Sequence, residues 1–339
     1  MPRQKIKVDG FEIGGEKTFI IAEIGSNHAQ SLKLAYETID AAVECGANAV
    51  KFQSINIKEL YYRPSKETIE LHKKIDLDEG WHQPLKNYCD KKKITFFSSP
   101  TYLKAVDILE GINVQLYKLA SAQIGTFPQI VEKVALTKKP VILSTGLVTK
   151  EELENVIRIF SKAGNDKFVI LHCNSIYPTP YERVGLRLME AYRKMFGCIV
   201  GFSDHTEGAA TAIAAVALGA KVIEKHFVLK RNIDSPDAPL SMEPPEFKEL
   251  VSGIRAAEAA VTEKLRTEIE PEERKFKERI LYKLILKKNK KKNDPVSKND
   301  FEYRRTSGGI DCRDVQIIFR KKYKTDLAAG KLLKHSDFN

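Results

Sequence analysis

The stretch CIVGFSDHTEGAATAIAAVALGAKVIEKHF, residues 198–227, decides the fold of this chain. It begins with an apolar run, continues through an alanine-rich segment that is typical of a helix, and ends with a second apolar run. Two strands joined by such a helix run parallel, so their ends come out side by side. His205 and His226 lie at those ends, 21 positions apart. The spacing predicts that both histidines bind one divalent metal ion.

The same alternation of strand and helix extends through the first part of the chain. Eight short apolar runs are expected to be strands: 18–22, 49–52, 94–97, 116–119, 140–143, 168–171, 198–202 and 221–223. Helical patterns are expected at 32–45, 103–109, 127–136, 150–162, 184–195, 208–218 and 246–264. Strict alternation favours a parallel sheet, and eight units in about 250 residues predict an α/β fold, the closed (β/α)8 TIM barrel. An open doubly wound sheet is the alternative, but the chain contains no GxGxxG turn.

The chain is expected to contain a second, smaller domain. The barrel, with a short N-terminal extension, is predicted to span residues 1–264, and a charged linker is predicted at 265–279. Strand-like runs at 280–286 and 315–319 predict a small β-rich domain at 280–339.

The composition excludes several classes of protein. Of the net charge of +11, +10 lies in the last 76 residues, with 22 Lys and Arg against 12 Asp and Glu. A nucleic-acid-binding tail is therefore an alternative, but the tail lacks interleaved aromatic residues, and no nucleic-acid partner is expected. Five cysteines without CxxC spacing predict reduced thiols. The chain shows no apolar stretch of about 20 residues and no apolar signal core, so a cytoplasmic protein without a membrane partner is expected.

Polar and reactive side chains follow nearly every predicted strand. In a (β/α)8 barrel these ends open on one face, where the active site is built. Lys51 and Lys118 are expected deep in this mouth, where a buried lysine requires an anion such as phosphate or carboxylate. Hydroxyl groups are expected to support that anion from Ser99, Ser121, Ser144 and Ser203. The alternative is that the lysines pair with Glu23 or Glu224 and only neutralise the core.

The two histidines are flanked by carboxylates. Neutral imidazole suits Mn, Zn, Fe or Co, and two histidines leave open positions for water and a substrate oxygen. Asp204 and Glu224 are candidates for hydrogen-bond partners of the histidines, and Glu224 is also a candidate acid or base. Asp237 alone is typical of a turn residue.

Seven ordered motifs resemble the sialic acid synthase family, which includes N-acetylneuraminate, pseudaminic acid and legionaminic acid synthases. They are IIAEIGSNH (20–28), AVKFQ (49–53), YKLAS (117–121), LSTG (143–146), HCNSIYP (172–178), GFSDHT (201–206) and EKHF (224–227). The resemblance spans most of residues 15–262. The tail is similar to that family's antifreeze-like (SAF) domain, mainly through RRTSGGI at 304–310.

The resemblance implies a metal-dependent transferase of sialic acid biosynthesis. Phosphoenolpyruvate would condense with an open-chain N-acylated amino sugar, giving a nine-carbon 2-keto acid and phosphate. The resemblance implies a divalent cofactor at His205 and His226, Mn2+ first with Mg2+ and Co2+ as alternatives. Another phosphoenolpyruvate-dependent 3-deoxy-ulosonate synthase is the alternative enzyme. That alternative requires additional arginines for a second phosphate, and the barrel half contains few.

Site residues carry over from the family by motif. Phosphoenolpyruvate is expected to bind Lys51, Ser99, Lys118, Ser121, Ser144, Ser175 and Ser203. The sugar is expected to bind Gln53, Gln123, Tyr177 and Asp237. The expected catalytic residues are Glu23, Glu224 and His226. The family also implies a domain-swapped homodimer in which Arg305, with Arg304 as the alternative, reaches the sugar from the partner subunit.

Two positions depart from the family pattern. Gln123 stands where the family often has Glu, and Ala238 follows Asp237 where His is frequent. The first change removes a negative charge from the part of the site that is expected to bind the sugar. The Asp237-Ala238 pair is more similar to the sequence of synthases for modified bacterial sugars such as pseudaminic or legionaminic acid.

Overall fold

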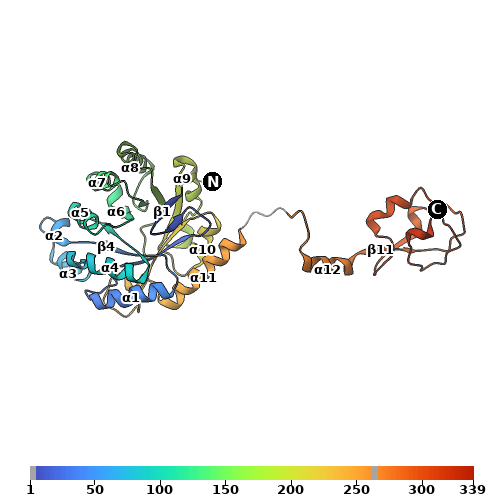
Figure 1. Ribbon diagram of the computed structural model, residues 1–339, viewed down its shortest axis with the longest axis horizontal. Coiled ribbons are helices and arrows are strands. Elements are labelled where there is room, and N and C mark those ends of the chain that lie inside the picture. Colours follow the sequence, from blue (N-terminus) through green and yellow to red (C-terminus); the bar gives the residue numbers. More distant parts are fainter. Residues whose placement is uncertain (1–4, 262–265) are drawn as a thin grey trace. The chain divides into compact units, whose positions relative to one another are not determined.

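A computed structural model describes residues 5–261 and 266–339 of the chain. The chain divides into two compact units, residues 1–262 and 263–339 (Figure 1). The predicted domain boundary between residues 264 and 265 lies outside the described residues. Helix α12 (Pro271–Ile280) begins in the segment predicted as a linker, 265–279, and ends one residue beyond it.

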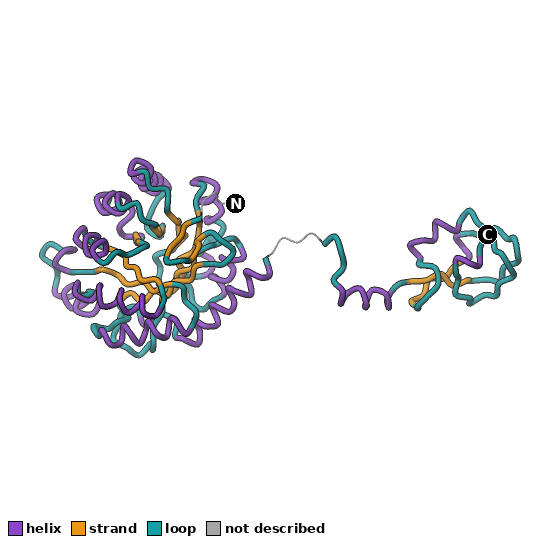
Figure 2. Tube along the Cα trace, viewed as in Figure 1, coloured by secondary structure: helices purple, strands orange, loops and turns teal. Residues whose placement is uncertain are grey.

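The first unit is built on an eight-stranded parallel sheet surrounded by helices (Figure 2). Its strands are β3 (Phe19–Gly25), β4 (Ala49–Ser54), β5 (Thr95–Pro100), β6 (Tyr117–Leu119), β7 (Val141–Ser144), β8 (Phe168–Cys173), β9 (Ile199–Asp204) and β10 (Val222–His226). Their order in the sheet is β5-β4-β3-β10-β9-β8-β7-β6. The two outer strands of this order, β5 and β6, contact each other and close the barrel. The predicted (β/α)8 barrel is confirmed.

Helices join these strands at the outside of the barrel. They are α1 (Leu32–Glu44), α4 (His82–Lys92), α5 (Leu103–Gly111), α6 (Ser121–Ile124), α7 (Pro128–Leu136), α8 (Lys150–Ala163), α9 (Leu188–Phe196), α10 (Ala210–Ala217) and α11 (Pro244–Ala260). Their apolar faces pack on the sheet in one large buried cluster. Burial of this interface is the main source of stability expected for the unit.

A hairpin closes the N-terminal end of the barrel. Strands β1 (Ile6–Val8) and β2 (Phe11–Ile13) pair antiparallel, and their apolar side chains join a second buried cluster. That cluster also contains residues from the beginnings of the barrel strands, such as Phe19 and Val222. The hairpin was not predicted as strands. It seals one end of the barrel with apolar groups, so polar chemistry is confined to the other end.

Gly201 allows β9 to pack closely between its neighbours. A Cβ atom at this position would lie 2.3 Å from the Val222 carbonyl oxygen and 2.6 Å from Leu171 Cδ2. No larger residue fits without moving a strand. The close approach brings the ends of β9 and β10, and therefore His205 and His226, to adjacent places on the rim.

The connection between β4 and β5 is the longest in the barrel. Before α4 it contains α2 (Ile57–Leu60), α3 (Lys66–Ile75) and the short turn η1 (Glu79–Trp81), where no helix was predicted. Two hydrogen bonds hold the ends of the α2–α3 segment together. The Ile57 N–H donates to Asp76 Oδ2 at 2.9 Å, and the Leu77 N–H donates to the Ile55 carbonyl at 3.1 Å. The α2–α3 segment therefore forms a closed lobe on the polar rim.

The second unit has little regular structure. Strand β11 (Tyr282–Leu286) pairs antiparallel with β12 (Phe301–Arg305) over a small apolar core. The strand predicted at 315–319 is wrong, because residues 315–318 belong to the 3-10 helix η5 (Cys312–Ile318) and Phe319 is its C-cap. The Asp311 side chain accepts the Arg313 N–H and starts that helical turn.

Two further findings concern the cysteines and the lengths of the helices. All five cysteines are free thiols, as predicted. Within residues 5–261 and 266–339, the helices are too short or too polar to cross a membrane.

Candidate active site

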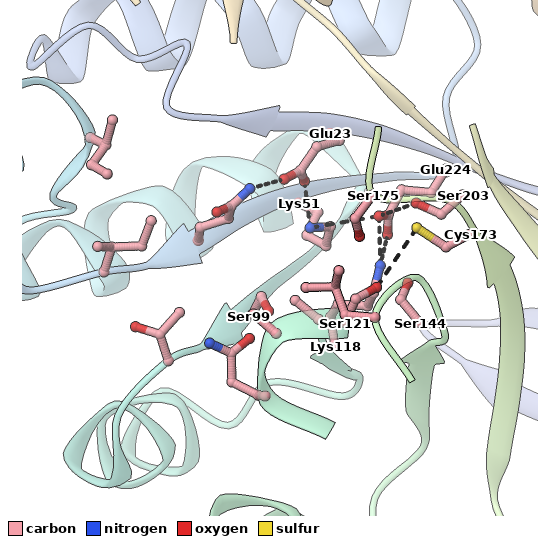
Figure 3. Close-up of a pocket in the computed structure, with 18 of the residues that line it drawn as sticks. Glu23, Lys51, Ser99, Lys118, Ser121, Ser144, Cys173, Ser175, Ser203 and Glu224 are labelled. Atoms are coloured by element: carbon pink, nitrogen blue, oxygen red, sulfur yellow. Dashed lines mark hydrogen bonds and ion pairs between the residues drawn. The ribbon is translucent and has the colours of Figure 1, made fainter. Parts of the chain in front are cut away.

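A cavity of about 650 Å3 opens at the C-terminal ends of the barrel strands. It is lined by all of the predicted site residues except Asp237 and Arg305. Side chains from different strands converge on its interior (Figure 3). The prediction that the polar strand ends form one ring is therefore confirmed as geometry.

Two lysines and two glutamates form the floor of this cavity. Lys118 Nζ lies 2.5 and 2.6 Å from the two carboxylate oxygens of Glu224. Lys51 Nζ lies 2.8 Å from Glu23 Oε2 and 3.8 Å from Glu224 Oε1 (Figure 3). All four side chains are buried. The alternative weighed from the sequence, in which the lysines pair with these glutamates, is the arrangement that the structure shows.

Burial and pairing set the protonation of the floor. Burial raises the pKa of Glu224, but Lys118 and Lys51 outweigh it and lower the pKa to about 2. Burial lowers the pKa of Lys118, and this effect exceeds the opposing effect of Glu224. Burial also lowers the pKa of Lys51, but Glu224 and Glu23 outweigh it and the net shift is upward. Glu224 is therefore ionised at neutral pH, and Lys118 holds its proton less tightly than Lys51.

Several buried polar atoms around the floor have no hydrogen-bond partner among the described residues. They are Ser99 Oγ, Ser144 Oγ, Gln123 Oε1 and His226 Nδ1. A buried polar atom without a partner costs about 1–3 kcal/mol, so such groups are rare in folded proteins. Their concentration around one cavity indicates a site built for a polar ligand.

A glycine that was not predicted as a site residue controls the spacing of the serines. The Gly146 N–H donates to Ser121 Oγ at 2.9 Å. A Cβ atom at Gly146 would lie 2.4 Å from Ser175 Oγ and 2.9 Å from Ser121 Oγ. Gly146 is the last residue of the LSTG motif, and this glycine was the sequence signal that could have identified the position.

The two histidines lie next to each other at the rim. Their ring centroids are 5.6 Å apart, and the Tyr177 ring lies 4.1 Å from that of His205. His205 Nδ1 donates to the Asn174 carbonyl at 2.7 Å, which leaves its Nε2 lone pair free to bind a metal. Burial, with a contribution from His226, lowers the pKa of His205 to about 3, so its ring is neutral.

The rings of His205 and His226 fit two ligand positions of a divalent ion. The Nδ1 atom of His226 has no hydrogen-bond partner among the described residues. Among the described residues no group of three or more His, Cys, Asp and Glu is arranged to hold a metal. A metal at this place would therefore take its other ligands from water and substrate.

Asp204 does not bind the histidines as expected. Its Oδ2 accepts from Lys225 Nζ at 2.9 Å, and its Oδ1 accepts from Thr206. Lys225 also donates to the Thr206 carbonyl at 2.6 Å. Asp204 and Lys225 point together to one side of neighbouring strands and join β9 to β10, which is a structural role.

Asp237 lies beside the cavity and is held by the end of β3. Its Oδ2 accepts from the Ser26 N–H at 2.9 Å and the Ser26 hydroxyl at 2.7 Å. A Cβ atom at Gly25, whose φ is +52°, would lie 2.6 Å from the same oxygen. Ser26 and Gly25 were not predicted as site residues, although the IIAEIGSNH motif contains both.

Arg305 lies in the second unit. It is on β12, and its guanidinium carbon lies 5.1 Å from the centroid of the Tyr282 ring. Its expected role in the site of the partner subunit stays a prediction.

Comparison with known proteins supports the family resemblance that the motifs indicate. The model of the NeuB family matches residues 38–266. A pseudaminic acid synthase of Campylobacter jejuni is 34% identical, with 95% of this chain and 97% of that protein covered. An uncharacterized protein of Methanocaldococcus jannaschii is 40% identical over 98% of each chain. The structure of an N-acetylneuraminic acid synthetase from Leptospira borgpetersenii superposes with a TM-score of 0.75 at 32% identity, covering 81% of this chain and 96% of that one. The family resemblance seen in the motifs is confirmed, and the chain belongs to the NeuB family.

Proposed function

We propose that this chain is a nonulosonic acid synthase. It condenses phosphoenolpyruvate with an open-chain N-acylated amino sugar and releases phosphate. One observation carries the proposal: in a single cavity, two buried lysines and the partnerless hydroxyls of Ser99 and Ser144 lie with two neighbouring histidines. Pseudaminic acid, legionaminic acid and N-acetylneuraminate-9-phosphate synthases among the relatives support the same reaction class.

Phosphoenolpyruvate would bind on the floor. Its carboxylate and phosphate need cations, which Lys51 and Lys118 provide, and Ser99, Ser144 and the remaining serines donate hydrogen bonds. In return the lysines give up part of their contact with Glu23 and Glu224. The partnerless hydroxyls gain acceptors, which offsets the cost of leaving them unpaired.

His205 and His226 would hold the divalent metal, with Mn2+ first. The metal would supply Lewis-acid polarisation of the sugar aldehyde. Gln53, Gln123, Tyr177 and Asp237 would orient the sugar.

The proposed reaction balances without an oxidant or reductant. C3 of phosphoenolpyruvate forms a bond to the aldehyde carbon, and the aldehyde oxygen takes a proton. Water adds at C2, and the C2–O bond to phosphate breaks. We propose that Glu23 and Glu224 move these protons. Glu23 accepts a hydrogen bond from Gln53 at 2.7 Å and pairs with Lys51.

The test uses purified protein with Mn2+, phosphoenolpyruvate and a panel of N-acylated hexosamines. Phosphate is expected only when metal and both substrates are present, and the product mass reports the sugar. His226→Ala is expected to abolish turnover, whereas His335→Ala, an exposed histidine of the second unit, is the matched control. Chelation is expected to stop the reaction and Mn2+ to restore it. Absence of sugar-dependent phosphate release across the panel would contradict the proposal.

The second unit is proposed to be an antifreeze-like domain that completes the site of the partner subunit in a swapped homodimer. Exposed Arg305 and the RRTSGGI motif support this proposal. Mixing Arg305→Ala subunits with His226→Ala subunits provides the test. Each variant alone is expected to be inactive, and hybrid dimers should regain activity because one barrel has both residues. No recovery in hybrids would show that the arginine acts within its own subunit or not at all.

A further inference from the structure

Asn27 is a buried amide that follows β3 and lies outside the lining of the cavity. Its side chain makes three hydrogen bonds, all to the segment that follows His226. Its Oδ1 accepts from the Ser235 hydroxyl at 2.9 Å. Its Nδ2 donates to the Ser241 hydroxyl at 2.8 Å and to the Phe227 carbonyl at 2.9 Å. The carboxamide therefore uses its oxygen and both of its N–H groups.

Two of these bonds hold the backbone of Asp237 from both sides. The Asp237 N–H donates to Ser235 Oγ at 3.3 Å, and the Ser235 hydroxyl donates to Asn27. Asn27 donates to Ser241 Oγ, and the Ser241 hydroxyl donates to the Asp237 carbonyl at 2.7 Å. The two peptide groups that flank Asp237 are thus joined to one carboxamide. These four residues are called the Asn27 ring.

The carboxylate of Asp237 is held by the residue before Asn27. Ser26 donates its N–H and its hydroxyl to Asp237 Oδ2, and the Ser26 side chain is buried. The connection from β10 to α11 contains one turn of 3-10 helix, η3 (Ala238–Leu240). Because side-chain hydrogen bonds and not a regular element fix this connection, the place of Asp237 depends on Ser26 and on the Asn27 ring.

The third bond of Asn27 reaches the strand that carries His226. Phe227 follows His226 directly, and its carbonyl accepts from Asn27 Nδ2. The Phe227 N–H donates to the Glu23 carbonyl at 2.8 Å. A displaced Phe227 would move His226 with it, because consecutive Cα atoms are about 3.8 Å apart. One buried side chain therefore contacts both the connection that contains Asp237 and the end of the histidine strand.

We propose that Asn27 is a positioning residue that sets the place of Asp237 relative to His226. It would align the carboxylate proposed to bind the sugar with the histidine proposed to bind the metal, so the inference rests on the proposed function. An amide is required, because it combines an acceptor with two donors on one small planar group. Ionised aspartate has the same shape but only accepts, and would leave the Phe227 carbonyl without its donor.

Asn27→Asp tests the inference through the kinetics of the two substrates. The KM for the N-acylated amino sugar is expected to rise by at least about 10-fold, while the KM for phosphoenolpyruvate stays unchanged. Ser235→Ala opens one side of the ring and should raise the sugar KM by a smaller factor, about 3- to 10-fold. A loss of stability alone would lower the amount of active enzyme and leave both KM values unchanged. An unchanged sugar KM in both variants of an active chain would overturn the inference.

Asn165→Asp is the matched control. Asn165 is also a buried amide, and its Nδ2 donates to the carbonyls of Ala135 and Lys139 at 3.2 and 3.0 Å. Its Oδ1 accepts the Lys167 N–H at 3.0 Å. It lies before β8, at the N-terminal end of that strand, whereas the cavity is at the C-terminal ends. The control should lose stability and keep both KM values, and a rise in its sugar KM equal to that of Asn27→Asp would overturn the inference.

Binding of Mn2+ tests the contact with the histidine strand. Titration followed by electron paramagnetic resonance requires no turnover. Asn27→Asp is expected to weaken Mn2+ binding by about 10-fold, because it removes the bond to Phe227 next to His226. Ser235→Ala keeps that bond and should leave the affinity unchanged. Equal Mn2+ affinity in the wild-type chain and in Asn27→Asp would overturn the link to His226.

Hydrogen exchange distinguishes failure of the inference from failure of the proposed function, because it needs no metal, substrate or turnover. Asn27→Asp is expected to speed exchange in residues 235–242 by at least about 10-fold, and Asn165→Asp should not. Unchanged exchange in that segment would overturn the inference whatever reaction the chain catalyses. Faster exchange in a chain that releases no phosphate with any sugar would count against the proposed reaction and still support the Asn27 ring.

Discussion

Both units bury charged side chains, but the charges have different partners. In the barrel, Lys118 and Glu224 bind each other and Lys51 lies between two glutamates. These side chains surround a cavity whose walls contain further polar atoms that have no hydrogen-bond partner in the part of the chain that the structure describes.

In the second unit the buried charges belong to turns. Asp300, Asp311 and Asp337 each accept a backbone N–H from two or three residues away, and each also pairs with a lysine or an arginine. Such acids cap turns in a unit whose apolar core is small.

The comparison shows that buried charge alone does not identify a functional site. A carboxylate that accepts backbone N–H groups is explained by the fold. A carboxylate that is held only by side chains lining a cavity is not explained by the fold. Polar atoms beside it that have no partner among the described residues indicate a ligand-binding site.

The largest effect is expected from breaking the pair on the floor. Lys118→Met leaves Glu224 buried with a weaker partner, so the barrel should lose about 3–5 kcal/mol of unfolding free energy. Phosphate release should fall by a factor on the order of 10²–10³. Denaturant titration and the phosphate assay measure the two effects.

The double variant Lys118→Met with Glu224→Leu sharpens this result. Stability should recover by several kcal/mol because both charges are gone, while activity stays lost. A double variant as unstable as the single one would show that the pair serves the fold, as the acids of the second unit do.

Gly146→Ala tests how closely the serines must be held. The added methyl group displaces Ser175 and Ser121, and a shift of about 1 Å in such groups costs about 100-fold in rate. The phosphate assay measures the loss, and the thermal midpoint of the barrel should change little because these serine side chains can move.

Gly309→Ala is the corresponding change in the second unit. Gly309 has a φ of +71°, and a Cβ atom there would lie 2.5 Å from Leu332 Cδ1. About 1–3 kcal/mol of stability should be lost from that unit, as measured by hydrogen exchange. Equal effects of both glycine variants on exchange would contradict the contrast between the units.

Asp300→Ala is expected to destabilise the second unit by about 1–3 kcal/mol. The change removes the acceptor of the Ser297 N–H and the Tyr323 hydroxyl, and the ion-pair partner of Lys290. Hydrogen exchange should rise in β11 and β12 and stay unchanged in the barrel strands. Faster exchange in β9 or β10 would contradict this prediction.

The smallest effect is expected for the stability of the second unit at acidic pH. The side chain and N–H of Arg313 hold the pKa of Asp311 well below its ordinary value. A lowered pKa stabilises the folded state above the unfolded value of about 3.9, and this stabilisation is lost as the pH falls toward the folded value. Asp311→Asn should therefore destabilise the second unit at pH 6 and have less effect at pH 3. Asp314→Asn, an exposed acid nearby, is the control, and an equal pH dependence in both variants would contradict the assignment.

The barrel could be predicted because its strands are buried and apolar at their beginnings. The runs at 198–202 and 221–223 located β9 and β10, although both strands continue through polar residues to Asp204 and His226. Polar residues extend a strand where its end faces a cavity, and apolar patterning does not record this. The α2–α3 lobe was missed because α2 has only four residues and α3 is rich in charged residues.

Most of the candidate site could also be predicted, because alternation along strands and the barrel geometry bring the strand ends together. The pairing of the lysines with Glu23 and Glu224 was one of two alternatives from the sequence, but the partner of Asp204 could not be predicted. Asp204 was expected near the histidines, but Lys225 on the neighbouring strand binds it instead. Which groups meet across two strands depends on side-chain directions that one sequence does not specify.

Gly201 has no reactive group, yet it limits how this sequence can evolve. Any other residue there would push β9 away from β10 and Leu171, and the displacement would reach His205 four positions later. This interior position tolerates no side chain, because a Cβ atom there would meet Val222 and Leu171. Residues of the α2–α3 lobe, which lie on a separate connection, can therefore change without disturbing the strand that carries the first histidine.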